Sequence, residues 1–154
     1  ASAAAAVYDG QFVLVNGQGG LDAASRALIQ SLNPAFISVL GASDTISAAL
    51  LADLQGIATV EQFNDPDASV RSAEVRSYMT SSTWVSLATS GAFPDALTAT
   101  PFSALAPPSP LMLVPGTCVP AAVRTTITRL GTTNLALFGG PAALDPAVES
   151  LTPC

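Results

Sequence analysis

The arginine residues are the side chains of this sequence best suited to binding an anion. Arg71 and Arg76 lie five residues apart in one predicted helix, and Arg124 and Arg129 have the same spacing in another. Five residues turn an α-helix through about 500°, so the members of each pair lie on adjacent faces. Guanidinium groups bind phosphate and carboxylate groups through paired hydrogen bonds. The sequence therefore offers two arginine pairs to an anionic ligand; the alternative is a solvated or salt-bridged surface.

A second candidate site is the segment 90–95, which joins an apolar run at 84–88 to a predicted helix. Its proline suits the first helical turn, and its acid suits the positive end of the helix. Open α/β sheets bind ligands at such strand-to-helix turns. We expect Ser90, Gly91 and Asp95 to lie at the mouth of a ligand site. The alternative is a structural segment, with the aromatic residue packed inward and the acid complementing the helix end.

The turn Gly17-Gln18-Gly19-Gly20 follows the apolar run 12–15 and suggests a phosphate-binding loop. It lacks the full G-x-G-x-x-G spacing, and no acidic residue follows about 20 residues on at a second strand end. We favour a tight turn that needs glycine at positive φ. We therefore expect no dinucleotide and no other cofactor.

The charge balance excludes several classes of partner. The five basic residues are all arginine and stand against 11 acidic residues, for a net charge of −6. Nucleic acids and anionic membrane surfaces both need a basic face, and every apolar run is shorter than the ~20 residues of a membrane span. Histidine, the usual general base and commonest metal ligand, is absent. We expect no nucleic-acid partner, no membrane insertion, no metal site and no enzyme.

The two cysteines, Cys118 and Cys154, predict a disulfide in an oxidising compartment. The bond closes a loop of 37 residues, counted from 118 to 154, and adds about 4 kcal/mol in the chain-entropy account. Two free buried thiols are the alternative.

Short apolar runs alternate with amphipathic stretches along the whole sequence. The predicted strands are 12–15, 36–40, 59–63, 84–88, 111–114 and 134–138. The predicted helices are 1–7, 21–32, 43–54 (capped by Ser43 or Asp44), a helix capped by 64–66 and running to about 79, 94–105, 120–130 and 144–151. Apolar strands between helices favour an α/β fold: an open, mostly parallel sheet with helices on both faces, in a Rossmann-like or toprim-like layered unit.

An internal repeat is readable within this alternation. Two residue pairs match at an offset of 99, and four further pairs match at 98. The matched pairs are Val15 with Val114, Gly17 with Gly116, Arg26 with Arg124, Ile29 with Ile127, Leu32 with Leu130, and Gly41 with Gly139. Residues 12–57 are thus related to 111–153, and 58–110 link them. We expect a single domain over 1–154 that holds about one and a half units and begins inside one.

The same segments resemble the cell-wall-binding repeat type 2 family of Gram-positive bacterial surface proteins. The matching residues are Ala88, Gly91, Phe93, Pro94, Asp95, Ala96, Leu97, the strand 111–114, Gly139, Gly140 and Leu144. Residues 40–47 look like a degenerate copy of the Gly-Gly segment, with Ala42 at its second glycine. The family's Asp-Arg-Tyr-x-Thr-Ala helix start corresponds here to residues 65–73, which lack the Arg-Tyr pair, so the role of that pair does not carry over.

The resemblance implies a non-catalytic module of a secreted, cell-surface protein. It would bind an anionic secondary polymer of the cell wall and pack with sister repeats or as a homo-oligomer, commonly in threes. A self-association or S-layer-type assembly module is one alternative. A wall-polymer hydrolase is another, and it would need Asp95 to converge with Glu61 or Glu74 in one cleft.

Overall fold

The computed structural model describes Ala5, residues 10–104 and residues 109–154. The chain forms two compact units: a smaller unit, Val13–Asp67, and a larger unit built on Ala68–Cys154. None of the helices in these described ranges has both the length and the apolar character needed to cross a membrane. The helix predicted over 1–7 lies outside the described residues, Ala5 excepted.

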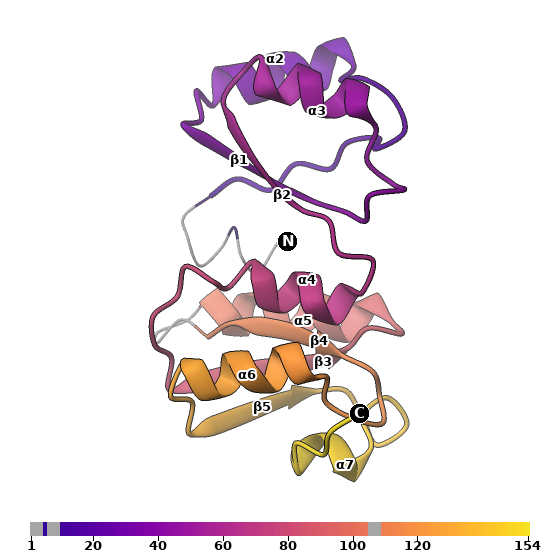
Figure 1. The fold of residues 1–154 in the computed structure, drawn as a ribbon, viewed down its shortest axis with the longest axis vertical. Coiled ribbons are helices and arrows are strands. Elements are labelled where there is room, and N and C mark those ends of the chain that lie inside the picture. The colour runs from indigo at the N-terminus through magenta and orange to yellow at the C-terminus, as the bar shows by residue number, and fades with distance from the viewer. Residues whose placement is uncertain (1–4, 6–9, 105–108) are drawn as a thin grey trace. The chain divides into compact units, whose positions relative to one another are not determined.

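The smaller unit contains two parallel strands and two helices (Figure 1). Its elements are α2 (Ala23–Ser31), β1 (Phe36–Leu40), α3 (Ala48–Gln55) and β2 (Thr59–Phe63). The strands pair with Phe36 opposite Thr59 and Leu40 opposite Phe63. Asp22 and Ser47 cap the two helices by accepting backbone N–H bonds. The core of the unit is formed by Ile29, Val39, Leu50 and Leu54.

Two predictions for the smaller unit are wrong. Residues 12–15 form no strand, because no described segment pairs with them; Val15 packs against the core while Leu14 is 81% exposed. The helix α3 begins after Ser47 and not after Ser43 or Asp44. Residues 42–45 instead form a turn closed by the Thr45 N–H bond to the Ala42 carbonyl, 2.9 Å long.

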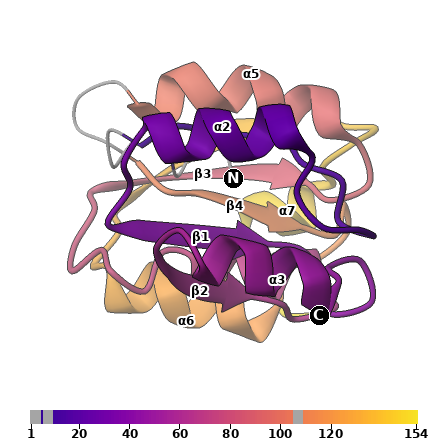
Figure 2. The same ribbon diagram turned by 90° about the horizontal axis from the view of Figure 1, so that it is seen from above.

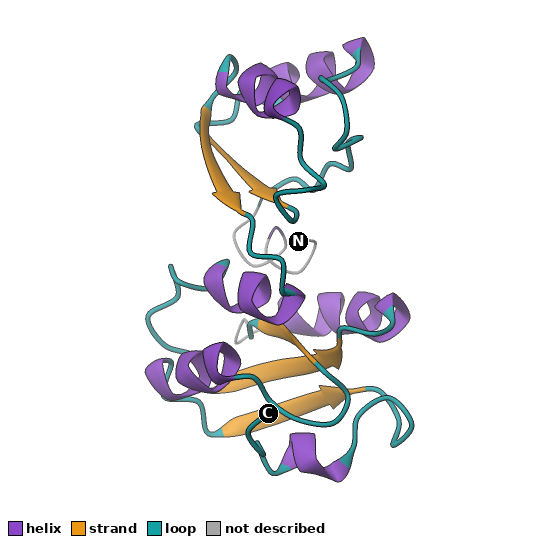
Figure 3. Ribbon diagram, turned by 45° about the vertical axis from the view of Figure 1, so that its right-hand side comes forward, coloured by secondary structure: helices purple, strands orange, loops and turns teal. Residues whose placement is uncertain are grey.

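The larger unit is a three-stranded parallel sheet between helices (Figures 2 and 3). Its elements are α4 (Ala68–Glu74), β3 (Trp84–Thr89), α5 (Phe93–Ala104), β4 (Leu111–Val114), α6 (Ala121–Arg129), β5 (Asn134–Phe138) and α7 (Pro146–Glu149). The strand order is β4-β3-β5, with Ser86 opposite Leu111 and Trp84 opposite Asn134. The helices α5 and α6 lie on opposite faces (Figure 2). The α/β class with parallel strands and helices on both faces is therefore confirmed.

The core of the larger unit lies between the sheet and α6. The central strand β3 is buried along nearly its whole length. The largest fully buried apolar side chains of this core are Leu87, Met112, Leu130, Val85, Val114, Val119, Val123 and Val148. At about 25 cal/mol per Å² of buried apolar surface, such side chains each contribute about 1.5–3 kcal/mol.

The helix α4 is shorter than predicted. It ends at Glu74, and the chain continues in turns whose N–H groups bond three residues back, as in Arg76 to Ala73 (3.1 Å). The Arg129 side chain donates to the carbonyl oxygens of Arg76 (3.1 Å) and Met79 (2.6 Å). The guanidinium of a distant helix therefore occupies carbonyls that a continued helix would have used. Arg71 lies on α4 and Arg76 beyond its end, so the predicted shared helix is wrong.

Elements of the two units correspond when 98 is added to the residue number. Ala23–Ser31 becomes Ala121–Arg129, and Phe36–Leu40 becomes Asn134–Phe138. Turns correspond as well, since the bond from Ser47 N–H to the Gly17 carbonyl (2.7 Å) has a counterpart from Asp145 N–H to the Gly116 carbonyl (2.7 Å), with the glycines at an offset of 99. The repeat and the single-domain organisation stay predictions.

Candidate functional site

The turn after β3 lies at the carboxyl edge of the larger sheet, as predicted for Ser90 and Gly91. Both residues are exposed. The Ser90 N–H donates to the carbonyl of Val114 at the end of β4 (2.8 Å), and the Gly91 N–H donates to the Thr89 hydroxyl (3.1 Å). The turn is thus tied to the neighbouring strand and to its own strand end, which holds these residues at the sheet edge.

Asp95 reaches from the first turn of α5 toward the turn after β5. A Cβ atom placed on Gly139 would lie 3.1 Å from Asp95 Oδ2. Gly139 also has φ of 142°, in the region that favours glycine. Segment 90–95 and the Gly139 turn therefore meet, as parallel topology requires. The alternative in which Phe93 packs inward is wrong, because its side chain is 74% exposed.

The loop after β4 completes this edge. The Gly116 carbonyl accepts the Asp145 N–H (2.7 Å), and a Cβ on Gly116 would lie 2.6 Å from the carbonyl oxygen of Ala143. The loops after β4 and β5 are therefore in contact, and only a residue without a side chain fits at 116. The three strand-to-helix turns of the larger unit share one edge of the sheet.

The arginines of the larger unit divide into two groups. Arg129 lies at the end of α6, and its bonds to the Arg76 and Met79 carbonyls hold the segment after α4. Arg76 is only 1% exposed. The sequence reasoning missed the positioning role of Arg129, which depends on contacts across some 50 residues. These two arginines have structural positions rather than open ones.

Arg124 occupies a different environment. It lies in the first turn of α6 and is half-buried, as is Arg71 on α4. Its Nε atom is buried, and no hydrogen-bond acceptor for it exists among the described residues. A crossover helix runs from the carboxyl edge of a parallel sheet toward the amino edge, so Arg124 lies nearer the turns of the carboxyl edge than Arg129 does. A buried cationic donor without an acceptor is costly, so this side chain is not held in place by bonds to the described residues as Arg129 is.

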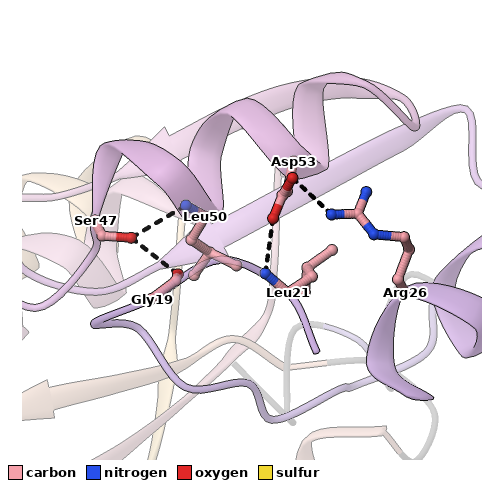
Figure 4. A network of polar contacts seen from close by, with 6 residues as sticks. All are labelled: Gly19, Leu21, Arg26, Ser47, Leu50 and Asp53. Atoms are coloured by element: carbon pink, nitrogen blue, oxygen red, sulfur yellow. Dashed lines mark hydrogen bonds and ion pairs between the residues drawn. The ribbon is translucent and has the colours of Figure 1, made fainter. Parts of the chain in front are cut away.

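The glycine-rich turn of the smaller unit is occupied by protein groups (Figure 4). The Asp53 carboxylate accepts the Leu21 N–H (2.8 Å) and pairs with Arg26 (2.6 Å). The hydrogen bond from the Arg26 side chain, followed by that from the Leu21 N–H, holds the pKa of Asp53 below its usual 3.8. A Cβ on Gly20 would lie 2.6 Å from Asp53 Oδ2. An ionised carboxylate against the turn opposes phosphate binding.

Close approach, not positive φ, explains the glycines at positions 17 and 20 of this turn. Among the described glycines only Gly131 and Gly139 have positive φ, so the positive-φ interpretation of residues 17–20 is wrong. A Cβ on Gly17 would lie 2.0 Å from the Thr45 carbonyl oxygen. Sequence reasoning also missed the Arg26–Asp53 ion pair, since no local pattern joins residues on two separate helices.

The Cys118–Cys154 disulfide is present, with the Cα atoms 4.9 Å apart. It supports a backbone contact, because the Val119 N–H donates to the Thr152 carbonyl (2.8 Å) and Val119 forms a bridge with Pro153. The alternative of two free thiols is therefore wrong.

The acidic residues form no metal-binding cluster in the described ranges. No cluster of three or more histidine, cysteine or acidic side chains there is able to hold a metal ion. Asp95 lies at the carboxyl edge of the sheet beside Gly139. Glu74 ends α4, two residues before Arg76, whose carbonyl meets the far end of α6. Asp95 and Glu74 are thus not brought together, whereas Glu61 belongs to the smaller unit and its pairing with Asp95 stays untested.

Comparison with known proteins places this parallel α/β module among cell-wall-binding domains. Residues 57–149 match the family described as "Cell wall binding domain 2 (CWB2)". That range is more than half of the chain, and the chain belongs to this family. It is a non-catalytic binding module that associates with the cell wall or cell surface.

Two solved structures share the fold. Cwp6 from Clostridium difficile matches with a TM-score of 0.79 and 18% identity, over 98% of this chain and 25% of that chain. Cwp8 from Clostridium difficile matches with a TM-score of 0.77 and 20% identity, over 97% of this chain and 26% of that chain. The chain thus spans about a quarter of each. A search of curated proteins found no match.

Proposed function

We propose that this module attaches a secreted protein to an anionic secondary polymer of the cell wall, and that Arg124 and Arg71 contact the polymer. The observation that carries the proposal is that Arg124 is half-buried on α6 and that no described residue accepts a hydrogen bond from its Nε. Because the Nε itself is buried, a phosphate or carboxylate oxygen of the polymer would bind the exposed remainder of the guanidinium through charge-assisted bonds.

The distribution of charge supports an anionic ligand despite the net charge of −6. Residues 68–154 contain four arginines and four acidic residues and are neutral. Residues 1–67 contain one arginine and seven acidic residues and carry the whole excess. A polyanion that approaches the larger unit therefore meets a neutral surface with local cations, although the chain as a whole is acidic.

Individual contacts of this kind are weak. Two half-exposed arginines supply a few charge-assisted bonds that salt screens over about 8–10 Å. Several linked modules raise the effective concentration of the second and later contacts, so that avidity exceeds the affinity of one site. Association with sister repeats is therefore part of this proposal.

The test is co-sedimentation of the purified chain with isolated cell walls, before and after acid extraction of their secondary polymers. Arg124→Gln and Arg71→Gln are the test variants. Arg26→Gln is the matched control, because Arg26 is paired with Asp53 in the smaller unit. We expect the loss of one charge-assisted bond to weaken binding about tenfold or more, while the control binds as the wild type does.

Two outcomes contradict the proposal. Equal sedimentation with intact and extracted walls would show that the secondary polymer is not the ligand. Unchanged binding of the Arg71→Gln, Arg124→Gln double variant across salt concentrations would remove the arginines from the site.

A self-association function is a second candidate, favoured by the outer surface of α5. Phe93 is 74% exposed and Leu97, one turn later, is 55% exposed. A contiguous exposed apolar patch is typical of a protein–protein contact surface. Light scattering on the wild type and on Phe93→Ser tests this function: a discrete oligomer that the substitution dissociates supports it, and a monomeric wild type rejects it.

A further inference from the structure

The two edge strands of the larger sheet differ in whether their outer backbone groups have a partner. At the β4 edge, α4 packs along the strand (Figure 1), and the Ser72 hydroxyl accepts the outward Leu113 N–H at 2.9 Å. At the other edge, no described strand pairs with the outer side of β5. The β5 sequence, Asn-Leu-Ala-Leu-Phe, has no charged residue and no proline. Charged residues and proline ordinarily protect an edge strand from pairing with another strand, and β5 has neither.

The backbone groups that β5 presents at its free edge can be identified. The Asn134 N–H donates to the Thr83 carbonyl, toward β3. Because successive N–H groups of a strand point to alternate sides, Ala136 and Phe138 also face β3, whereas Leu135, Leu137 and Gly139 face outward. Both side-chain faces of β5 are covered, since Leu135 and Leu137 pack against the core and Phe138 contacts Phe102. What β5 lacks is a partner for its backbone.

The smaller unit shows which partner fits such an edge. The strand β1 occupies the position of β5 at the offset of 98, residue for residue. The side of β1 that corresponds to the free side of β5 is paired with β2. The Gly41 N–H, at the position of Gly139, donates to the Phe63 carbonyl (3.2 Å) and extends that ladder. The sequence that fills the edge is Thr-Val-Glu-Gln-Phe.

The start of the family match shows that the pairing of β1 with β2 joins residues inside the matched repeat to residues before it. The match begins at residue 57, so β2 is the first strand of the repeat 57–149. The compact unit that contains β2, however, extends from Val13 to Asp67, and β1 lies before the repeat begins. The first strand of the repeat therefore completes a sheet formed by residues outside that repeat.

We propose that the free edge of β5 binds the first strand of a sister repeat, a strand of the β2 type, as a fourth parallel strand. Leu135, Leu137 and Gly139 would then donate to it as Gly41 donates to Phe63, and repeats would be joined by shared sheets. The pairing is a β-strand addition in which backbone bonds provide the affinity. It names a surface for association with sister repeats and does not depend on the wall polymer.

The experiment uses a peptide of residues 57–67 and the full chain labelled with ¹⁵N. We expect saturating peptide to slow hydrogen exchange of the Leu135, Leu137 and Gly139 amides by at least about tenfold. The Ala136 and Phe138 amides, which already face β3, are the internal controls and stay unchanged. Because no wall material is present, the result is independent of polymer binding.

Two N-methylated peptides provide a matched control. The Phe63 carbonyl faces β1, so alternation places the N–H of Glu61 on the bonding side and that of Gln62 on the opposite side. N-methylation at Glu61 should abolish the slowing of exchange, and N-methylation at Gln62 should preserve it. Absence of slowing at the three outward amides with the unmodified peptide, or equal effects of the two methylated peptides, would overturn the proposal.

Discussion

Removal of the Cys118–Cys154 disulfide should lower the free energy of unfolding by an amount that follows from the length of the loop it closes. The bond joins residues with a sequence separation of 36, and closing a loop of this size in the unfolded chain is worth about 4 kcal/mol at 25 °C. The native contact between Val119 and residues 152–153 consists of backbone bonds and persists without the sulfur atoms. The Cys118→Ser, Cys154→Ser variant should therefore fold as the wild type does and lose about 4 kcal/mol.

Tryptophan fluorescence during urea unfolding measures this loss in the larger unit alone. Trp84 is the single tryptophan, and it lies in β3 with its ring 6.4 Å from that of Phe102. With an m-value of about 2 kcal/mol per M, the midpoint should fall by about 2 M. Reduced wild type should match the variant, and reductant should not change the variant.

The loop-closure reasoning would be refuted by a midpoint shift under about 0.5 M, provided that mass spectrometry finds the bond intact in the wild type. The unfolded larger unit would then retain structure that already holds residues 118 and 154 near each other. If the urea midpoint of the variant differs from that of reduced wild type, the two serine side chains themselves change the free energy of unfolding.

Three further substitutions test local features. Gly17→Ala should destabilise the smaller unit by about 1–3 kcal/mol, because its Cβ would overlap a carbonyl oxygen at 2.0 Å; Gly19→Ala, with no atom within 4 Å, is the control, and equal urea midpoints by circular dichroism would contradict this. The pKa of Asp53 is lowered in the fold, so its stabilisation is complete above its usual 3.8 and lost as the pH falls through the lowered value. Asp53→Asn should therefore destabilise at neutral pH and not in strong acid, and a pH-independent difference in melting temperature would reject the assignment. Ser72→Ala should cost the larger unit about 1–3 kcal/mol by leaving the Leu113 N–H without its acceptor, which tryptophan fluorescence would detect; an unchanged midpoint would show that water replaces the hydroxyl.

The strands were the predictable part of the fold. Residues 36–40, 59–63, 111–114 and 134–138 are strands with the predicted bounds. Three of them are apolar along most of their length, as buried parallel strands are, whereas 59–63 contains Glu61 and Gln62. The meeting of Asp95 with the Gly139 turn was also accessible, since parallel strands bring their carboxyl ends to one edge. Local sequence thus identified the sheet edge at which the candidate residues lie.

The missed features depend on contacts between distant residues. The segment that follows α4 is bonded to Arg129, some 50 residues further along the chain, and no pattern near Glu74 indicates this contact. The strand predicted at 12–15 had the right composition, but a strand also requires a partner, and none is described there. The strand β5 is the opposite case. Its composition is suited to pairing with a strand on each side, whereas the described chain supplies a paired strand on one side only.

The two proposals reinforce each other through geometry. An anion site of one or two arginines gives useful retention on a wall only when several copies bind together. A flexible linker between copies would lower the effective concentration as its length increases, whereas a shared strand fixes neighbouring repeats at a constant spacing and orientation. Strand exchange at β5 would therefore increase avidity for the wall without changing the affinity of any single site. An excess of the peptide of residues 57–67 should accordingly weaken the wall binding of multi-repeat proteins and leave the wall binding of the 154-residue chain unaffected. Equal inhibition of both would show that strand pairing at β5 does not contribute to avidity for the wall.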